Sequence, residues 1–192
     1  MVLEHAAGGD LLRLVKKRKR LDEALAAFYF RQILDGLAAW HSMGVLHRDI
    51  KLDNILIGSD EEVVKICDFG VSRIMTCGKK VFEKCGTPAY IAPEVISDVG
   101  YEGFYSDLWS LGILLYSMVS GTVPFKATCM KDLHKLILSG VYNVPQYLSP
   151  ACVNIIENLL LLVPTDRLGI PELLQHPWVK KDPERPMSPF KK

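Results

Sequence analysis

Four polar side chains in two short segments have the types and the spacing that phosphate chemistry needs. Asp49, Lys51 and Asn54 lie in the segment HRDIKLDN, residues 47–54, and Asp68 opens the tripeptide DFG. Two carboxylates and an amide are costly to bury unless they face water or a cation. Oxygen ligands of this kind suit a magnesium ion that carries phosphate groups. A lysine beside an aspartate can stabilise charge on a transferred phosphoryl group while the aspartate orients a hydroxyl.

Each of these charges could instead cap a turn, and for any single residue that interpretation would be preferred. The whole set, in this order, favours a site for phosphoryl chemistry. A third segment, GTPAYIAPE at residues 86–94, ends a stretch from Asp68 to Glu94 that has no long hydrophobic periodicity. Loops of this length inside a compact domain are usually functional.

Short strands and helices must position these segments. Apolar runs at 45–46 and 55–57 flank the first segment, and a run at 63–66 precedes DFG. Short strands packed against helices fit these runs. One long helix is predicted between Asp22, which can cap its N-terminus, and Gly44, which can end it. Helical spacing predicts further helices at 11–19, 106–120, 129–139, 150–163 and 171–176.

The composition indicates one domain with a sizeable core and little net charge. The chain has 192 residues, 49% of them hydrophobic, and its 23 basic residues nearly balance 22 acidic ones. This balance gives no reason to expect nucleic acid or a membrane as a partner. The basic run at residues 16–20 is most simply a solvated helix end, with a localisation signal or an anionic docking patch as the alternatives.

Cysteine usage predicts a reducing compartment. The five cysteines are scattered, odd in number and never spaced C-x-x-C, which argues against a disulfide framework and against a zinc site. The first residues lack the layout of a signal peptide. The apolar stretches at 108–119 and 155–163 are too short to span a bilayer. We therefore expect a soluble, cytoplasmic protein, with the nucleus as an alternative location.

The motifs HRDxKxxN, DFG and APE resemble, in order and spacing, those of the eukaryotic serine/threonine protein kinase family. DLWSLG at 107–112, Arg167 in PTDRL and HPW at 176–178 agree with this resemblance. It implies an α+β, protein-kinase-like fold. Residues 1–178 would hold the hinge and a predominantly α-helical C-terminal lobe, with short strands around the catalytic loop, residues 47–54. Residues 179–192 would form a polar tail.

The resemblance implies a role for each residue of the site. Asp49 would orient or accept the proton of a substrate hydroxyl, and Lys51 would contact the transferred phosphate of ATP. Asn54 and Asp68 would hold Mg²⁺. Lys51, two residues after the aspartate, and Thr87 in GTP follow the serine/threonine pattern rather than the tyrosine pattern.

The adenosine part of ATP would lie near the start of the chain. By the resemblance, backbone groups of Glu4 and Ala6 would meet adenine, and Leu3 would be the gatekeeper. Asp10 would bond the ribose, although it also suits a helix cap that needs no ligand. Leu56 would form the floor of the adenine pocket.

The activation segment, which runs from DFG to APE over residues 68–94, departs from the family pattern at one position. Arg48 would normally pair with a phosphorylated residue of this segment. Four residues before Thr87, where such kinases often place a threonine, this chain has Glu83. We expect Glu83 to substitute in part for the phosphate, with Arg73 as a second partner. A simply solvated Glu83 is the alternative.

Two supporting contacts also follow from the resemblance. Glu94 of APE would pair with Arg167, and Asp107 would anchor the backbone of the catalytic loop. Asp10 and Asp53 match positions that, in basophilic relatives of the calcium/calmodulin-dependent and AMP-activated groups, face arginines of the substrate. We therefore expect a protein substrate with basic residues upstream of its serine or threonine.

The sequence contains no GxGxxG loop and no VAIK lysine, which kinases use to hold the nucleotide phosphates. We therefore expect the β-rich N-terminal lobe to be missing and this chain alone to be inactive or weak. A regulatory protein could then cover the apolar surface that the N-terminal lobe would otherwise cover. The alternative function is a non-catalytic truncated kinase that acts as a scaffold or regulator through protein binding.

Overall fold

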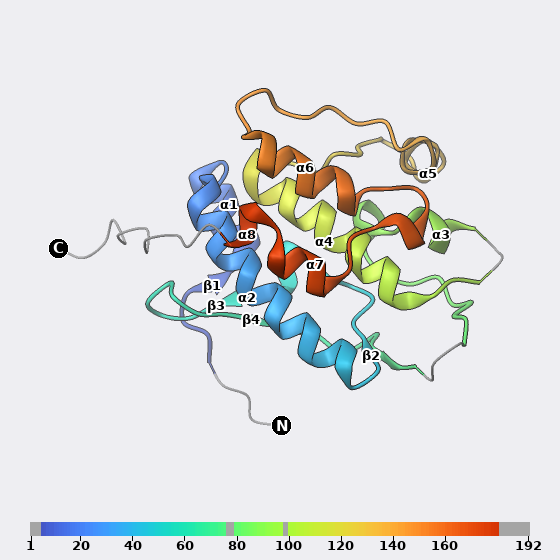
Figure 1. Ribbon diagram of the computed structural model, residues 1–192, viewed down its shortest axis with the longest axis horizontal. Helices are drawn as coiled ribbons and strands as arrows, with labels where there is room; N and C mark the ends of the chain where they lie inside the picture. The colour runs from blue at the N-terminus through green and yellow to red at the C-terminus, as the bar shows by residue number, and fades with distance from the viewer. Residues whose placement is uncertain (1–4, 76–78, 98–99, 181–192) are drawn as a thin grey trace.

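A computed structural model of the chain describes residues 5–75, 79–97 and 100–180. Helices dominate this part, and the long helix α4 (Gly103–Ser120) lies at its centre, packed against α2 (Glu23–Ser42) (Figure 1). The remaining helices are α1 (Leu11–Arg18), α3 (Pro93–Ile96), α5 (Met130–Ser139), α6 (Pro150–Leu159), α7 (Ile170–Gln175) and α8 (Pro177–Lys180). The predicted helical lobe is therefore confirmed.

The helix ends follow from caps in the sequence. The Asp22 carboxylate accepts a hydrogen bond from the backbone N–H of Leu25 at 2.9 Å, and Ser149 caps α6 in the same way. These acceptors satisfy backbone donors that have no partner within the helix. At the end of α4, Gly121 has a φ of 77°, and a Cβ there would collide with the carbonyl oxygen of Lys19. The position that ends α4 therefore requires glycine.

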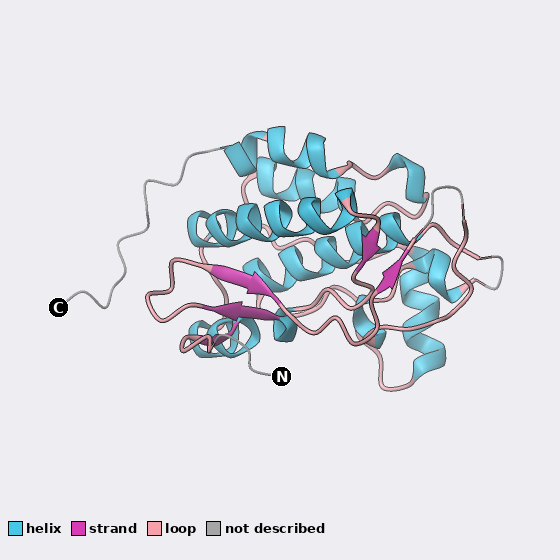
Figure 2. Cartoon of the chain, turned by 90° about the horizontal axis from the view of Figure 1, so that it is seen from below, coloured by secondary structure: helices cyan, strands magenta, loops and turns pink. Residues whose placement is uncertain are grey.

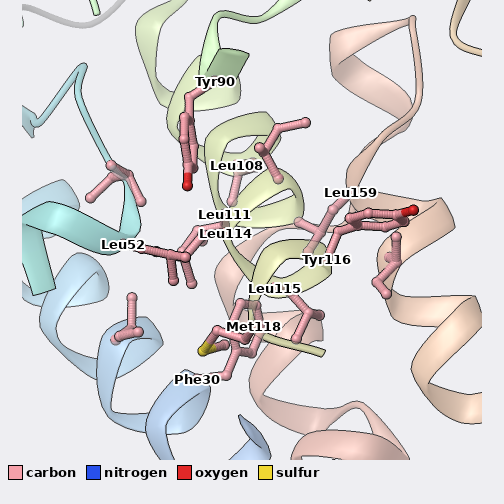
Figure 3. Close-up of a cluster of buried hydrophobic side chains, with 14 of the residues drawn as sticks. Phe30, Leu52, Tyr90, Leu108, Leu111, Leu114, Leu115, Tyr116, Met118 and Leu159 are labelled. Atoms are coloured by element: carbon pink, nitrogen blue, oxygen red, sulfur yellow. The ribbon is translucent and has the colours of Figure 1, made fainter. Parts of the chain in front are cut away.

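Helix α4 forms the centre of the hydrophobic core. Its sequence is apolar on nearly every side, and residues 106–119 are all buried, as expected for such a helix. Figure 3 shows Leu52 and Tyr90 among the side chains gathered around α4, together with Phe30 from α2. The core thus supports the segments that carry the polar motifs. Neither α4 nor any other helix in the described ranges is long and apolar enough to cross a membrane.

Short strands form two small antiparallel sheets, drawn in magenta in Figure 2. The first sheet has the order β1-β3-β4, and the second pairs β2 with β5. The strands are β1 (Gly9–Asp10), β2 (Val45–Leu46), β3 (Ile55–Ile57), β4 (Val64–Ile66) and β5 (Arg73–Ile74). Because Ile55 pairs with Ile66, the end of segment 47–54 lies beside the start of DFG.

Some elements differ from the sequence prediction. Helix α6 ends at Leu159 rather than at residue 163, because Leu160 leaves the helical conformation and Val163 is restricted by the proline that follows it. Strand β5 and the four-residue helix α3 are not predicted from the sequence, since β5 is exposed and contains no apolar run, and a single helical turn shows no measurable periodicity.

Candidate active site

One buried carboxylate holds the backbone of the loop at residues 47–54. Asp107 on α4 has no exposed surface. Its Oδ2 accepts a hydrogen bond from the backbone N–H of His47 at 3.0 Å, and its Oδ1 accepts one from that of Arg48 at 2.9 Å. The Nε2 of His41 lies 2.9 Å from Oδ2. These partners offset the cost of burying the carboxylate and give Asp107 the contacts of the predicted anchor.

The carboxylate of Asp49 has donors on both oxygens. The Nζ of Lys51 lies 2.7 Å from Oδ2, and the Nδ2 of Asn54 donates to the same oxygen at 3.2 Å. Thr87 donates to Oδ1 through its backbone N–H at 2.9 Å and its hydroxyl at 2.7 Å. Lys51 also donates to the Thr87 hydroxyl oxygen at 2.8 Å. The structure thus brings the three predicted catalytic residues together with a residue of the activation segment.

These contacts set the ionisation of Asp49. Partial burial disfavours the charged form, but hydrogen bonds from Lys51 and Thr87 outweigh it, so the pKa of Asp49 lies below its ordinary value. Asp49 is therefore a carboxylate at neutral pH. Only the carboxylate can orient a hydroxyl by accepting its hydrogen bond and then take its proton.

Asn54 and Asp68 lie at the same end of the β3–β4 hairpin, since the Asn54 carbonyl accepts a hydrogen bond from the N–H of Cys67 at 2.9 Å. The side-chain nitrogen of Asn54 also donates to the Asp49 carbonyl at 2.9 Å, which leaves its amide oxygen as the end suited to a cation. Asp68 is exposed. One amide oxygen and one carboxylate fit a magnesium ion that keeps phosphate and water ligands.

The rings of His47 and Trp40 pack against Phe69 of the DFG segment, and the sequence patterns alone assign neither residue this role. The ring centroid of Phe69 lies 4.8 Å from that of His47 and 4.5 Å from that of Trp40. The Nδ1 of His47 accepts a hydrogen bond from the Asp49 N–H at 3.3 Å, so its Nε2 is the donor to the carbonyl of Cys67 at 3.0 Å. His47 therefore ties the two motifs together. Its place in the HRD motif was the available signal.

The predicted adenosine contacts divide between described and undescribed residues: Ala6, Asp10 and Leu56 are described, whereas Leu3 and Glu4 lie outside the described residues. Asp10 pairs with Leu56 in the β1–β3 register. The Oδ1 of Asp10 accepts a hydrogen bond from the N–H of Arg13 at 2.7 Å, which is the helix cap that the sequence offers. The ribose contact remains a prediction.

Arg48 and Arg73 converge on one carboxylate of the activation segment. The Oε2 of Glu83 lies 3.0 Å from the Nη1 of Arg48 and 3.2 Å from the Nη1 of Arg73. The hydrogen bond from Arg48 and the charge of Arg73 hold the pKa of Glu83 below its ordinary value. The predicted contacts are present, although the Glu83 side chain is 64% exposed.

A buried ion pair fastens the far end of this segment. Arg167 is 4% exposed. Its Nη1 and Nη2 lie 2.6 and 2.7 Å from the two carboxylate oxygens of Glu94, on α3. Arg167 also donates to the carbonyls of Tyr105 and Leu161, at 2.7 and 2.9 Å. The contact predicted between Glu94 and Arg167 is thus present. It is a bidentate ion pair, and Arg167 also has two backbone carbonyls as acceptors.

Several known proteins are similar to this chain in sequence. A family model described as "Protein kinase domain" matches residues 1–179. The chain is 40% identical over 173 residues to a protein kinase domain-containing protein, ppk9, of Schizosaccharomyces pombe; the match covers 90% of this chain and 32% of that protein. It is 38% identical over 188 residues to the maternal embryonic leucine zipper kinases of Xenopus tropicalis and Xenopus laevis, covering 93% of this chain and 28% of each.

The family model covers nearly the whole chain and includes all three motifs at the site. The chain therefore belongs to the protein kinase family, as predicted. It spans roughly a third or less of the length of these curated relatives.

Proposed function

We propose that the protein transfers the γ-phosphate of ATP to serine or threonine hydroxyls of protein substrates, with Mg²⁺ as the cofactor ion. The observation that carries this proposal is the set of donors around Asp49, formed by Lys51, Asn54 and Thr87. The Thr87 hydroxyl donates to this carboxylate, so a similar hydroxyl is a suitable substrate group. The names of the relatives, which are kinases, support the same reaction.

In the proposed reaction, the substrate oxygen forms a bond to the γ-phosphorus while the bond from that phosphorus to the oxygen of ADP breaks. Asp49 orients the hydroxyl and takes its proton. Lys51 stabilises negative charge on the transferred group. Asn54 and Asp68 would hold the magnesium ion, which offsets phosphate charge when it is bound.

The charge near the site favours substrates with basic residues upstream of the acceptor. Asp53 is exposed in the short 3-10 helix η1 (Leu52–Asn54), and Asp10 is partly exposed beside β3. Arginines of a bound peptide would be complementary to these carboxylates. Peptides with and without upstream arginines test this preference, and equal kcat/KM values for the two would contradict it.

We also propose a cytoplasmic location. Free thiols at Cys67, Cys85, Cys129 and Cys152 suit a reducing compartment. Fluorescence microscopy of the tagged protein tests this location, and a nuclear signal that depends on the basic residues 16–20 would contradict it.

Phosphoryl transfer should be measured on the protein expressed from its full coding sequence, with peptides that differ only in a Ser, Thr or Tyr acceptor. Asp49→Asn should lower kcat by about 10²- to 10⁴-fold and leave ATP binding unchanged. Asp68→Asn should weaken magnesium-dependent binding of a non-hydrolysable ATP analogue in calorimetry. Asp60→Asn, in an exposed turn, is the matched control and should behave like the wild type.

Two results would count against the proposal. Transfer to tyrosine alone would exclude the serine/threonine specificity. Absence of both transfer and magnesium-dependent nucleotide binding would favour the alternative, a non-catalytic member of the family that acts as a scaffold or regulator.

A further inference from the structure

Glu83 connects two segments that are far apart in the sequence. Arg48 precedes Asp49 in the catalytic loop, and Arg73 lies in β5, after DFG. Their guanidinium groups contact the same oxygen of Glu83, at 3.0 and 3.2 Å. Arg48 further donates from Nε to the carbonyl of Val71 at 2.6 Å, so its guanidinium joins both halves of the activation segment.

The backbone around Glu83 is fixed from the other side as well. The hydroxyl of Tyr101 donates to the Glu83 carbonyl at 2.9 Å, and Val81 pairs with Tyr101 in an isolated β-bridge. Tyr101 and Val81 are both buried. The chain at residues 81–83 therefore lies between a buried anchor and the two arginines, although the carboxylate itself faces solvent.

A short path leads from Glu83 to the catalytic carboxylate. The next residues, Lys84, Cys85 and Gly86, lead to Thr87, whose N–H and hydroxyl both bond Asp49. A Cβ on Gly86 would lie 2.8 Å from the carbonyl oxygen of Arg48, so the two segments touch there. The position of Thr87 at Asp49 thus depends on how firmly this stretch is held.

We propose that Glu83 is a positioning residue, which holds the activation segment against the catalytic loop through Arg48 and Arg73 without any covalent modification. This inference rests on the proposed kinase function, because its consequence is the placement of Thr87 at the catalytic carboxylate. Two guanidinium groups face one negative charge, so the site would equally suit a dianionic phosphate. Glu83 supplies a permanent single charge in that place.

The competing explanation is a solvated glutamate whose ion pairs contribute nothing measurable. Exposed pairs often behave in this way. Glu83 differs from an isolated surface pair because its two partners come from separate segments and one of them, Arg48, has a side chain that is only 10% exposed. An experiment must therefore report on the order of the segment itself.

Hydrogen exchange of the 192-residue chain, measured by mass spectrometry, gives that readout without any need for catalysis. Glu83→Gln keeps the size of the side chain and removes its charge. It should speed exchange in peptides covering residues 79–87 by about three- to five-fold. Glu83→Asp should retain part of the protection, and Arg73→Met should reproduce part of the loss.

The matched control is Asp132→Asn, which removes an exposed carboxylate paired with Lys135 at 3.5 Å within α5. It should leave exchange at 79–87 unchanged. Equal exchange in wild type and Glu83→Gln would overturn the proposal, and so would an equal effect of Asp132→Asn.

Activity provides a second readout on the protein from its full coding sequence. Glu83→Gln should lower kcat while KM for ATP changes by less than about two-fold, because the nucleotide contacts are untouched. Treatment of the wild type with a broad-specificity phosphatase should leave kcat unchanged. A wild type that phosphatase inactivates would overturn the inference and leave the kinase function intact. A protein without transfer, but with protection that depends on Glu83, would count against the proposed function alone.

Discussion

Asp107 holds the backbone of Arg48 in a left-handed conformation. Arg48 has a φ of 67°, and its N–H donates to the buried Oδ1 of Asp107 at 2.9 Å. A left-handed conformation at a non-glycine residue costs of order 1–3 kcal/mol and persists only when the surroundings enforce it. Here the enforcement comes from a helix 59 positions further along the chain. The next residue, Asp49, is thereby pointed toward Lys51 and Thr87.

This relationship predicts that Asp107→Asn destabilises the fold. Asparagine offers one acceptor oxygen where Asp107 has two, and its NH₂ group would face one of the donors. We expect the free energy of unfolding in urea to fall by about 1–3 kcal/mol. Asp35→Asn, in an exposed pair with Arg31 at 3.6 Å, is the control and should stay within about 0.5 kcal/mol of the wild type. Equal stability of both variants would contradict the anchoring role.

The buried pair of Arg167 and Glu94 gives a second prediction. Arg167→Met should lower the free energy of unfolding by about 3–5 kcal/mol, because it leaves the Glu94 carboxylate without its charged partner. Adding Glu94→Leu should restore part of the loss, since an apolar pair avoids the unpaired charge. Lys135→Met removes an exposed partner of Asp132 and should have little effect. Thermal unfolding of the wild type, Arg167→Met, the double variant and Lys135→Met measures these differences.

Gly86 provides a test of the contact between the activation segment and the catalytic loop. It has a φ of 110°, and an added Cβ would lie 2.8 Å from the Arg48 carbonyl oxygen. Gly86→Ala should therefore cost about 1–3 kcal/mol of stability and lower kcat, since Thr87 is displaced from Asp49. Gly36→Ala, in helix α2, should be tolerated, because the nearest side-chain atom to its Cβ would be the Cδ1 of Ile66 at 3.4 Å. Normal kcat in Gly86→Ala would show that this close approach is dispensable.

The sequence was most informative where the chemistry is local. Asp49, Lys51 and Asn54 lie within six residues, and together with Asp68 their types and order favour a phosphate site. Helices with strong caps, such as the one begun by Asp22, were predicted for the same reason. Contacts between residues that are far apart in the sequence cannot be predicted from local sequence patterns. The pairing of Glu94 with Arg167, 73 positions apart, was expected only through the family resemblance.

Other residues escaped prediction because their roles depend on packing. Trp40 carries a pattern typical of any core helix, yet its ring lies against Phe69 of DFG. His41 looks like a polar residue near a helix end, yet it bonds the buried Asp107. Neither partner could be predicted before the orientation of α2 against the catalytic loop was known.

The ionisation of Asp49 predicts how stability depends on pH. Burial raises the pKa of Asp49, but the hydrogen bonds from Lys51 and Thr87 lower it by more, so the folded-state pKa lies below the unfolded value. A group with a lowered folded pKa binds protons more readily when unfolded, and its stabilising contribution is present above the unfolded pKa. The contribution is lost as the pH falls through the folded pKa.

We therefore expect the stability difference between wild type and Asp49→Asn, measured by urea unfolding, to stay constant from neutral pH down to about the ordinary aspartate value of 3.9. Below that pH, the wild type should lose stability relative to Asp49→Asn until the pH has fallen through the folded-state pKa. In a Lys51→Met background, this loss should be smaller, because loss of the Lys51 hydrogen bond and charge raises the folded-state pKa of Asp49 toward its unfolded value. Lys131→Met, on the exposed side of α5, should leave the profile unchanged. A profile that is identical in the Lys51→Met background would show that Lys51 does not tune Asp49.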